Sequence, residues 1–170
     1  MRRRLPQVLA FVAGTFLPTA TNLGKPLALP AAKPDSRLQQ LRAFFRELNS
    51  PAEHLAPDFL KASDRYRHDW RLLPSIAVVE TGGGKVAPNN NLMGWSSGTV
   101  RFRTPAEGIH TVAERLANSG YYRYKSLDEM LETYNPVGGY PQRVREVMQM
   151  IGEPELGPKL PPRPRLAPAY

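Results

Sequence analysis

Apolar residues recur along most of this chain at the spacing of an amphipathic helix. A first stripe follows Ser36 and consists of Leu38, Leu41, Phe44, Phe45 and Leu48. A second stripe lies in residues 57–68 and contains Phe59, Leu60 and Tyr66. Positions three and four apart share one face of a helix, so both segments are predicted to be helices that bury this face.

A third helical pattern carries a carboxylate on its apolar face. Its positions i, i+3, i+4 and i+7 are Leu73, Ile76, Ala77 and Glu80. The helix is predicted to begin near Asp69 or Trp70, and the three glycines at 82–84 end it. An apolar face and the negative end of the helix dipole both disfavour an ionised carboxylate. They favour the protonated form of Glu80, which is the form that a general acid requires.

Capping motifs and a last apolar stripe predict three further helices. Thr104 with Glu107, and Ser126 with Glu129, form two capping boxes, and the second helix is predicted to run to about Tyr134. The last helix begins at Tyr140 or Pro141 and carries Val144, Val147, Met148 and Ile151. Residues 85–104 lack helical periodicity. The alternation at 99–103 is typical of a strand, so we expect a small irregular lobe with a β-hairpin there. The expected fold is mainly α, of the α+β kind.

The two ends of the chain differ in composition from the middle. Residues 1–20 place three arginines before a short apolar stretch, which is typical of a secretory signal peptide, with an uncleaved anchor as the alternative. Residues 21–35 contain three prolines and are predicted to be a linker. Residues 153–170 contain six prolines and are predicted to be an extended tail. The folded domain is therefore expected to span residues 36–152.

Charge and composition narrow the classes of function. The net charge is +8, and 20 basic against 15 acidic residues leave +5 once residues 1–20 are removed. A basic surface suits an anionic partner such as a cell-wall polymer, although it can also be merely solvated. The basic residues are scattered, so no nucleic-acid partner is expected. The chain has no cysteine, and its three histidines lack the spacing of metal ligands, so neither a metal nor a cofactor is expected.

Glu80 is the candidate for chemistry because the other acids have structural explanations. Those acids lie in the first turns of helices, on polar helix faces or in loops, whereas Glu80 lies on an apolar face. The segment PNNNLMGW at 88–95 then brings side-chain amides and an indole together. Amides suit sugar hydroxyls, and an aromatic ring suits a pyranose face. The alternatives are a loop built from Asx turns and a core tryptophan. Five tyrosines at 121–140 could orient a substrate or fill the core.

Four motifs, taken in order, resemble those of the bacterial glucosaminidase domain, a group of peptidoglycan hydrolases with a lysozyme-like fold. ETGGGK at 80–85 resembles its E-S-x-x-G-K signature, and NNLMG at 90–94 resembles its N-N-L-F-G loop. FRT at 102–104 resembles its F-x-[ST] step, and Tyr134 with YPQRV at 140–144 resembles its closing tyrosine and final helix. The resemblance covers about residues 55–151. The loop at 92–94 is also similar to that of lytic transglycosylases.

This resemblance implies a lysozyme-like fold and an endo-β-N-acetylglucosaminidase that cleaves β-1,4 bonds of peptidoglycan. It implies Glu80 as the general acid and Tyr134 near the reacting sugar. The substrate-binding residues would be Asn90, Asn91, Met93, Gly94 and Trp95. The chain departs from the family pattern at Thr81, at Gly83 and at Met93. Gly83 replaces a bulkier residue, so a wider cleft is expected.

The partner of Glu80 and the reaction type stay open at the level of sequence. No second carboxylate stands out, so a distant acid, a water held by Tyr134 or the N-acetyl group of the substrate could assist. The alternatives are a lytic transglycosylase or muramidase with the same acid, or a non-catalytic protein that binds the cell wall. We expect a monomer in the periplasm or cell wall. It would bind glycan strands and meet the membrane only through its signal segment.

Overall fold

The computed structural model describes residues 35–153, which fold into six α-helices and two short 3-10 helices, with no strand. The α-helices are α1 Ser36–Glu47, α2 Ala56–Tyr66, α3 Leu72–Thr81, α4 Pro105–Asn118, α5 Leu127–Tyr134 and α6 Tyr140–Ile151. The 3-10 helices are η1 Pro51–Leu55 and η2 Pro88–Asn90. The prediction of a mainly helical domain is confirmed. The predicted signal segment (1–20), linker (21–35, apart from Asp35) and tail (153–170, apart from Glu153) lie outside the described residues.

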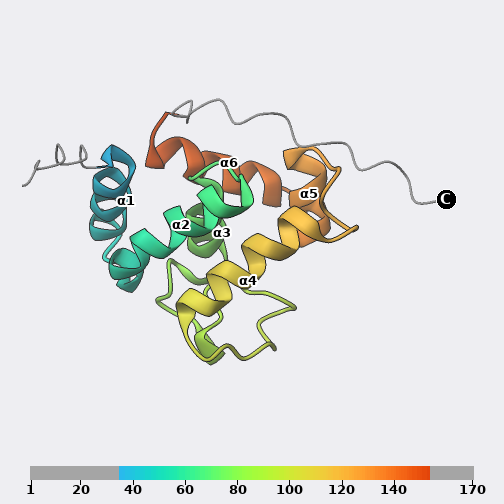
Figure 1. The fold of residues 1–170 in the computed structure, drawn as a ribbon, viewed down its shortest axis with the longest axis horizontal. Coiled ribbons are helices and arrows are strands. Elements are labelled where there is room, and N and C mark those ends of the chain that lie inside the picture. Colours follow the sequence, from blue (N-terminus) through green and yellow to red (C-terminus); the bar gives the residue numbers. More distant parts are fainter. Residues whose placement is uncertain (1–34, 154–170) are drawn as a thin grey trace, which may run out of the picture. The chain divides into compact units, whose positions relative to one another are not determined.

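Helix α3 lies among the other helices (Figure 1) and is the most apolar of the six. Every residue from 72 to 77 is buried. The helix packs against α6 and α2, and α2 packs in turn against α4. A helix that is apolar on all sides belongs in the core of a domain. Glu80 is therefore carried to the edge of the core by a helix that neighbouring helices hold in place.

The two predicted capping residues, Thr104 and Ser126, are the N-caps of α4 and α5, and one of the two boxes differs from the prediction. Ser126 and Glu129 make the full capping box of α5, which ends at Tyr134 as predicted. The Thr104 side chain accepts from the Glu107 backbone N–H at 3.1 Å. The Glu107 carboxylate, however, accepts from the backbone N–H of Arg103 at 2.7 Å. In the box of α4, the Glu107 side chain therefore bonds to the residue before the N-cap and not to the N-cap Thr104 itself.

Helix α3 begins later than the sequence predicts, at Leu72 rather than near Asp69 or Trp70. The reason is a turn before the helix. The Asp69 carboxylate accepts from the backbone N–H of Arg71 at 3.0 Å, and the Asp69 carbonyl accepts from the N–H of Leu72 at 3.0 Å. A short acidic side chain that bonds to the backbone two residues later favours such a turn over a helix.

The β-hairpin expected within residues 85–104 does not form, because this segment contains only turns, η2 and irregular backbone. Side-chain amides take the place of a partner strand. Asn91 Nδ2 donates to the Val100 carbonyl at 3.1 Å, and Asn90 Nδ2 donates to the Phe102 carbonyl at 3.0 Å. The alternating pattern at 99–103 therefore arises from a loop that buries one side chain, Phe102, and not from a strand. No helix within residues 35–153 is both long and apolar enough to span a bilayer.

Candidate active site

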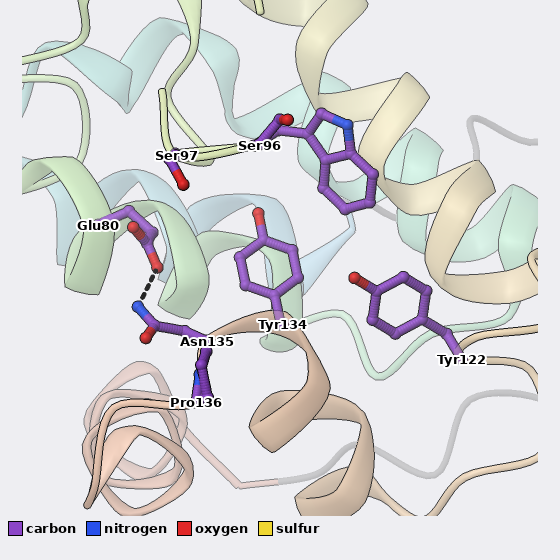
Figure 2. A pocket seen from close by; sticks show the side chains of 9 residues that line it. Glu80, Ser96, Ser97, Tyr122, Tyr134, Asn135 and Pro136 are labelled. Atoms are coloured by element: carbon purple, nitrogen blue, oxygen red, sulfur yellow. Dashed lines mark hydrogen bonds between the residues drawn. The ribbon is translucent and has the colours of Figure 1, made fainter. Parts of the chain in front are cut away.

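A pocket of about 370 Å³ opens at the C-terminal end of α3 (Figure 2). Its walls come from the end of α3, the loop at 94–97, the segment before α5 and the end of α5. The lining residues are Glu80, Gly94, Trp95, Ser96, Ser97, Tyr122, Tyr134, Asn135 and Pro136. Four of the predicted site residues, Glu80, Gly94, Trp95 and Tyr134, therefore meet in one place.

Glu80 is the one acidic residue among those that line the pocket. It is half-buried in the last turn of α3, where the helix places its carboxylate at the pocket wall. Figure 2 shows the Asn135 amide directed at this carboxylate, and Asn135 Nδ2 donates to Glu80 Oε1 at 3.4 Å. The contact is long, so the carboxylate has no strong hydrogen-bond donor among the described side chains.

Gly94 leaves the space that the Glu80 carboxylate occupies. A Cβ atom at this position would lie 2.4 Å from Glu80 Oε2 and 2.9 Å from its Cδ atom. The φ angle of Gly94 is +63°, a conformation that side-chain-bearing residues rarely adopt. Both the conformation and the close approach require glycine. The resemblance placed Gly94 at the cleft, and the structure places it against the acid itself.

Thr81 joins the end of α3 to this loop. Its buried hydroxyl lies 2.9 Å from the carbonyl of Ala77 and 2.8 Å from that of Leu92, and it donates its single proton to one of them. The same oxygen accepts from the backbone N–H of Gly84 at 3.0 Å. Thr81 therefore supplies the hydroxyl that serine would supply, and its position next to Glu80 fixes the loop relative to the acid.

Aromatic rings form a second wall of the pocket. The Trp95 ring lies 6.2 Å from that of Tyr122 and 5.6 Å from that of Tyr134, measured between centroids. The Tyr134 hydroxyl donates to the Met93 carbonyl at 2.5 Å. Burial and then the nearby charge of Glu80 raise the pKa of Tyr134 well above its usual value. Tyr134 thus stays a neutral donor that fixes the loop, and Trp95 is both half-buried and part of the wall.

Ser96 and Ser97 add hydroxyls at the mouth of the pocket. Both are exposed, and both have positive φ angles, 54° and 56°. The Ser97 hydroxyl points into the pocket on the side of Glu80 (Figure 2). Left-handed backbone at residues other than glycine is uncommon and recurs at functional sites. These serines, together with Asn135 and Pro136 just after α5, were not among the site residues predicted from sequence.

Three residues predicted to bind substrate do not line the pocket. Asn91 is 1% exposed, and Met93 is fully buried. Asn91 Oδ1 accepts from the N–H of Trp95 at 2.9 Å, and Asn91 Nδ2 donates to the carbonyls of Trp95 and Val100. Asn90 Nδ2 donates to the carbonyls of Phe102 and Arg103. These side chains build the loop, as the Asx-turn alternative allowed, and Met93 contributes its backbone carbonyl.

Gly83 does not widen the pocket, contrary to the expectation from sequence. A Cβ atom at Gly83 would lie 2.4 Å from Ser50 Oγ, away from the pocket-lining residues. The Ser50 hydroxyl donates to the Gly83 carbonyl at 2.6 Å. The glycine is needed for close packing between the turn after α3 and the start of η1, and it has no part in the width of the cleft.

The described residues offer no cluster of three or more His, Asp or Glu side chains that could hold a metal ion. What the pocket does offer is one carboxyl group, an aromatic wall and hydroxyl and amide groups. No protein family, no curated protein and no solved structure matches the chain. Its function is therefore inferred from the residues of the pocket themselves.

Proposed function

We propose that this protein cleaves glycosidic bonds in the glycan strand of peptidoglycan, with Glu80 as the general acid. The observation that carries the proposal is the half-buried Glu80 carboxyl at the wall of a pocket of about 370 Å³. A carboxyl group at a pocket wall is the type of group that acts as a general acid towards the oxygen of a leaving group. The proton passes to the glycosidic oxygen, the C–O bond breaks, and the Glu80 carboxylate remains.

The composition of the wall supports a carbohydrate ligand. The rings of Trp95 and Tyr122 present apolar faces suited to a pyranose. Ser96, Ser97 and Asn135 present hydroxyl and amide groups suited to hydroxyls and N-acetyl groups. The sequence motifs at 80–85 and 90–94 support a glucosaminidase of the lysozyme-like kind, because Thr81 and Gly94 make the contacts that tie the two motifs together.

The absence of a second acid from the pocket favours one group of mechanisms. Glycosidases with two carboxylates hold them about 5–10 Å apart across the scissile bond. Among the nine residues that line the pocket, Glu80 is the only one with a carboxylate. The attacking group is then supplied by the substrate, either as the N-acetyl oxygen, whose cyclic product is opened by water to complete hydrolysis, or as a sugar hydroxyl. The second of these routes yields a 1,6-anhydro sugar, so a lytic transglycosylase is the second candidate function.

The cellular location belongs to the same proposal. Residues 1–20 carry the pattern of an export signal, and a net charge of +8 suits an anionic cell-wall polymer. We place the protein in the periplasm or cell wall as a monomer that binds glycan strands.

Zymography on peptidoglycan tests the activity. The wild type is expected to clear the substrate, and Glu80→Gln is expected to lose at least about 100-fold in rate, the usual range for a general acid. Glu132→Gln, on an exposed position of α5, is the matched control and should clear normally. Clearing that survives Glu80→Gln contradicts the role of this residue. Retention on peptidoglycan without any clearing indicates a binding protein. Mass spectrometry of the products separates reducing ends from 1,6-anhydro ends.

A further inference from the structure

The Tyr140 hydroxyl is a buried polar group without a hydrogen bond. Within residues 35–153, the buried side-chain atoms that lack a hydrogen-bond partner are Ser63 Oγ, Trp70 Nε1 and the Tyr140 hydroxyl. Tyr140 is 1% exposed, so water does not compensate. Buried polar groups are almost always paired, and an unpaired one has a measurable cost. Of the three residues, Tyr140 is the one that lies beside the candidate acid.

Tyr140 reaches Glu80 from the helix packed against α3. It is the first residue of α6, whose packing against α3 brings the start of one helix to the end of the other. Its ring stacks on that of Tyr134 with centroids 6.2 Å apart and planes 12° apart. Burial, and then the influence of the adjacent Glu80 carboxylate, raise the pKa of Tyr140 far above its usual value. Its hydroxyl keeps its proton at any physiological pH, close to Glu80 but outside good hydrogen-bond geometry.

We propose that Tyr140 is a positioning residue that donates a hydrogen bond to the Glu80 carboxylate once that group has given up its proton. The inference rests on the proposed function, since it concerns the charge that proton transfer creates. A protonated carboxyl group gains little from a donor, whereas the carboxylate left after transfer gains a charge-assisted hydrogen bond. A donor that is unpaired before the transfer and paired after it stabilises only the later state, and such differential stabilisation lowers the barrier.

The surroundings of Glu80 leave this role to few groups. The pocket lining contains no Lys, Arg or His side chain to balance a carboxylate. From α5, the Tyr134 hydroxyl is already bonded to the Met93 carbonyl. The Asn135 amide, just after α5, is 3.4 Å away. From α6, the Arg143 guanidinium carbon lies 5.7 Å from the centre of the Tyr140 ring, and its charge favours ionisation of groups nearby. Tyr122 is the remaining titratable group of the wall.

Titration of the glutamate carboxyl groups, followed by ¹³C NMR in the full chain, tests the inference without relying on activity. In Tyr140→Phe the midpoint for Glu80 is expected to move to higher pH by about one unit, because the carboxylate loses a charge-assisted hydrogen bond. Ser63→Ala removes a buried, unpartnered hydroxyl elsewhere and should leave the midpoint unchanged. An unchanged midpoint in Tyr140→Phe would overturn the proposal.

Kinetics and stability give further readouts. With activity on peptidoglycan, Tyr140→Phe should lower kcat about tenfold with little change in KM, and the alkaline limb of the pH profile should move to higher pH. Phe keeps the stacked ring, so Tm should not fall. If Tyr140→Phe lowers Tm, its effect on the free energy of unfolding is measured in the wild-type background and in the Glu80→Gln background. A cost that persists in the Glu80→Gln background contradicts the proposal. An inactive wild type whose Glu80 midpoint still depends on Tyr140 refutes the proposed function and leaves the contact standing.

Discussion

Gly94 is the residue on which the position of the Glu80 carboxylate depends most directly. The loop backbone passes so close to the acid that a Cβ atom would lie 2.4 Å from Glu80 Oε2. A contact this short forces the carboxylate, the loop or both to move. The loop is also tied to α3 by Thr81, so the carboxylate is the part that would give way.

Substitution of Gly94 by Ala is therefore expected to displace Glu80 and lower activity by more than tenfold. It also adds the cost of a positive φ angle, about 1–2 kcal/mol. Gly98→Ala is the matched control, since Gly98 has a φ of +75° but nothing within 4 Å of an added Cβ. Activity and Tm are measured for both variants. Equal loss of activity in the two would mean that the close contact with Glu80 does not matter.

Sequence alone predicted Glu80 and part of the pocket wall, but it assigned other loop residues to the wall wrongly. Glu80 stood out because a carboxylate on a helical apolar face is rare and the helix period is regular. Asn91 and Met93 were assigned to the substrate because the loop at 90–94 resembles that of the glucosaminidase domain. Asn91 instead bonds to backbone groups up to nine residues away, and the Met93 carbonyl accepts from the Tyr134 hydroxyl, 41 residues away. No periodic pattern records such contacts. Tyr140 was noted in the sequence, but its place beside Glu80 comes from the packing of α6 against α3, which no local pattern records.

At the scale of elements, residues 82–104 are held by side-chain amides together with backbone turns and the Thr81 hydroxyl. Asn91 is the centre of this network, with one acceptor bond from Trp95 and donor bonds to two carbonyls. Helices were predicted well because their caps and apolar stripes are local signals. The hairpin was predicted wrongly because alternation at 99–103 is also produced by a loop with a single inward ring, Phe102.

Asn91→Ala is expected to destabilise the protein by about 1–3 kcal/mol, because a part-buried N–H and two part-buried carbonyls lose their partners. Activity should fall as well, since Trp95 and Gly94 follow directly in the chain. Urea unfolding with activity measured in parallel provides the check. Asn118→Ala, at the exposed end of α4, is the control and should change stability by less than about 0.5 kcal/mol. A stable Asn91→Ala variant with reduced binding would instead support direct contact with substrate.

At the scale of the whole domain, Arg71 connects the start of α3 with the end of α6. Its guanidinium donates to the Gly152 carbonyl at 2.7 Å and to both oxygens of Asp69. The residue is buried apart from about a tenth of its surface, so these bonds are shielded from water. The contact spans 81 positions of the chain and holds α6, with Tyr140 at its other end, against the helix that carries Glu80.

The ion pair between Asp69 and Arg71 predicts a defined dependence of stability on pH. Burial alone would raise the pKa of Asp69, but the hydrogen bonds from Arg71 outweigh it and hold the pKa below the ordinary 3.8. A carboxyl group whose pKa is lower in the folded state stabilises the fold at pH values above the ordinary pKa. This contribution is lost as the pH falls through the lowered value. Asp69→Asn lacks the contribution at every pH.

The free energy of unfolding of the wild type should therefore exceed that of Asp69→Asn at neutral pH, and the difference should shrink below about pH 4. Urea unfolding at a series of pH values measures this difference. Glu47→Gln, at the exposed end of α1, serves as the control and should track the wild type throughout. A difference that stays constant from neutral to acid pH would show that Asp69 acts through the shape of the turn before α3. Its charge would then have no part in joining the two ends of the domain.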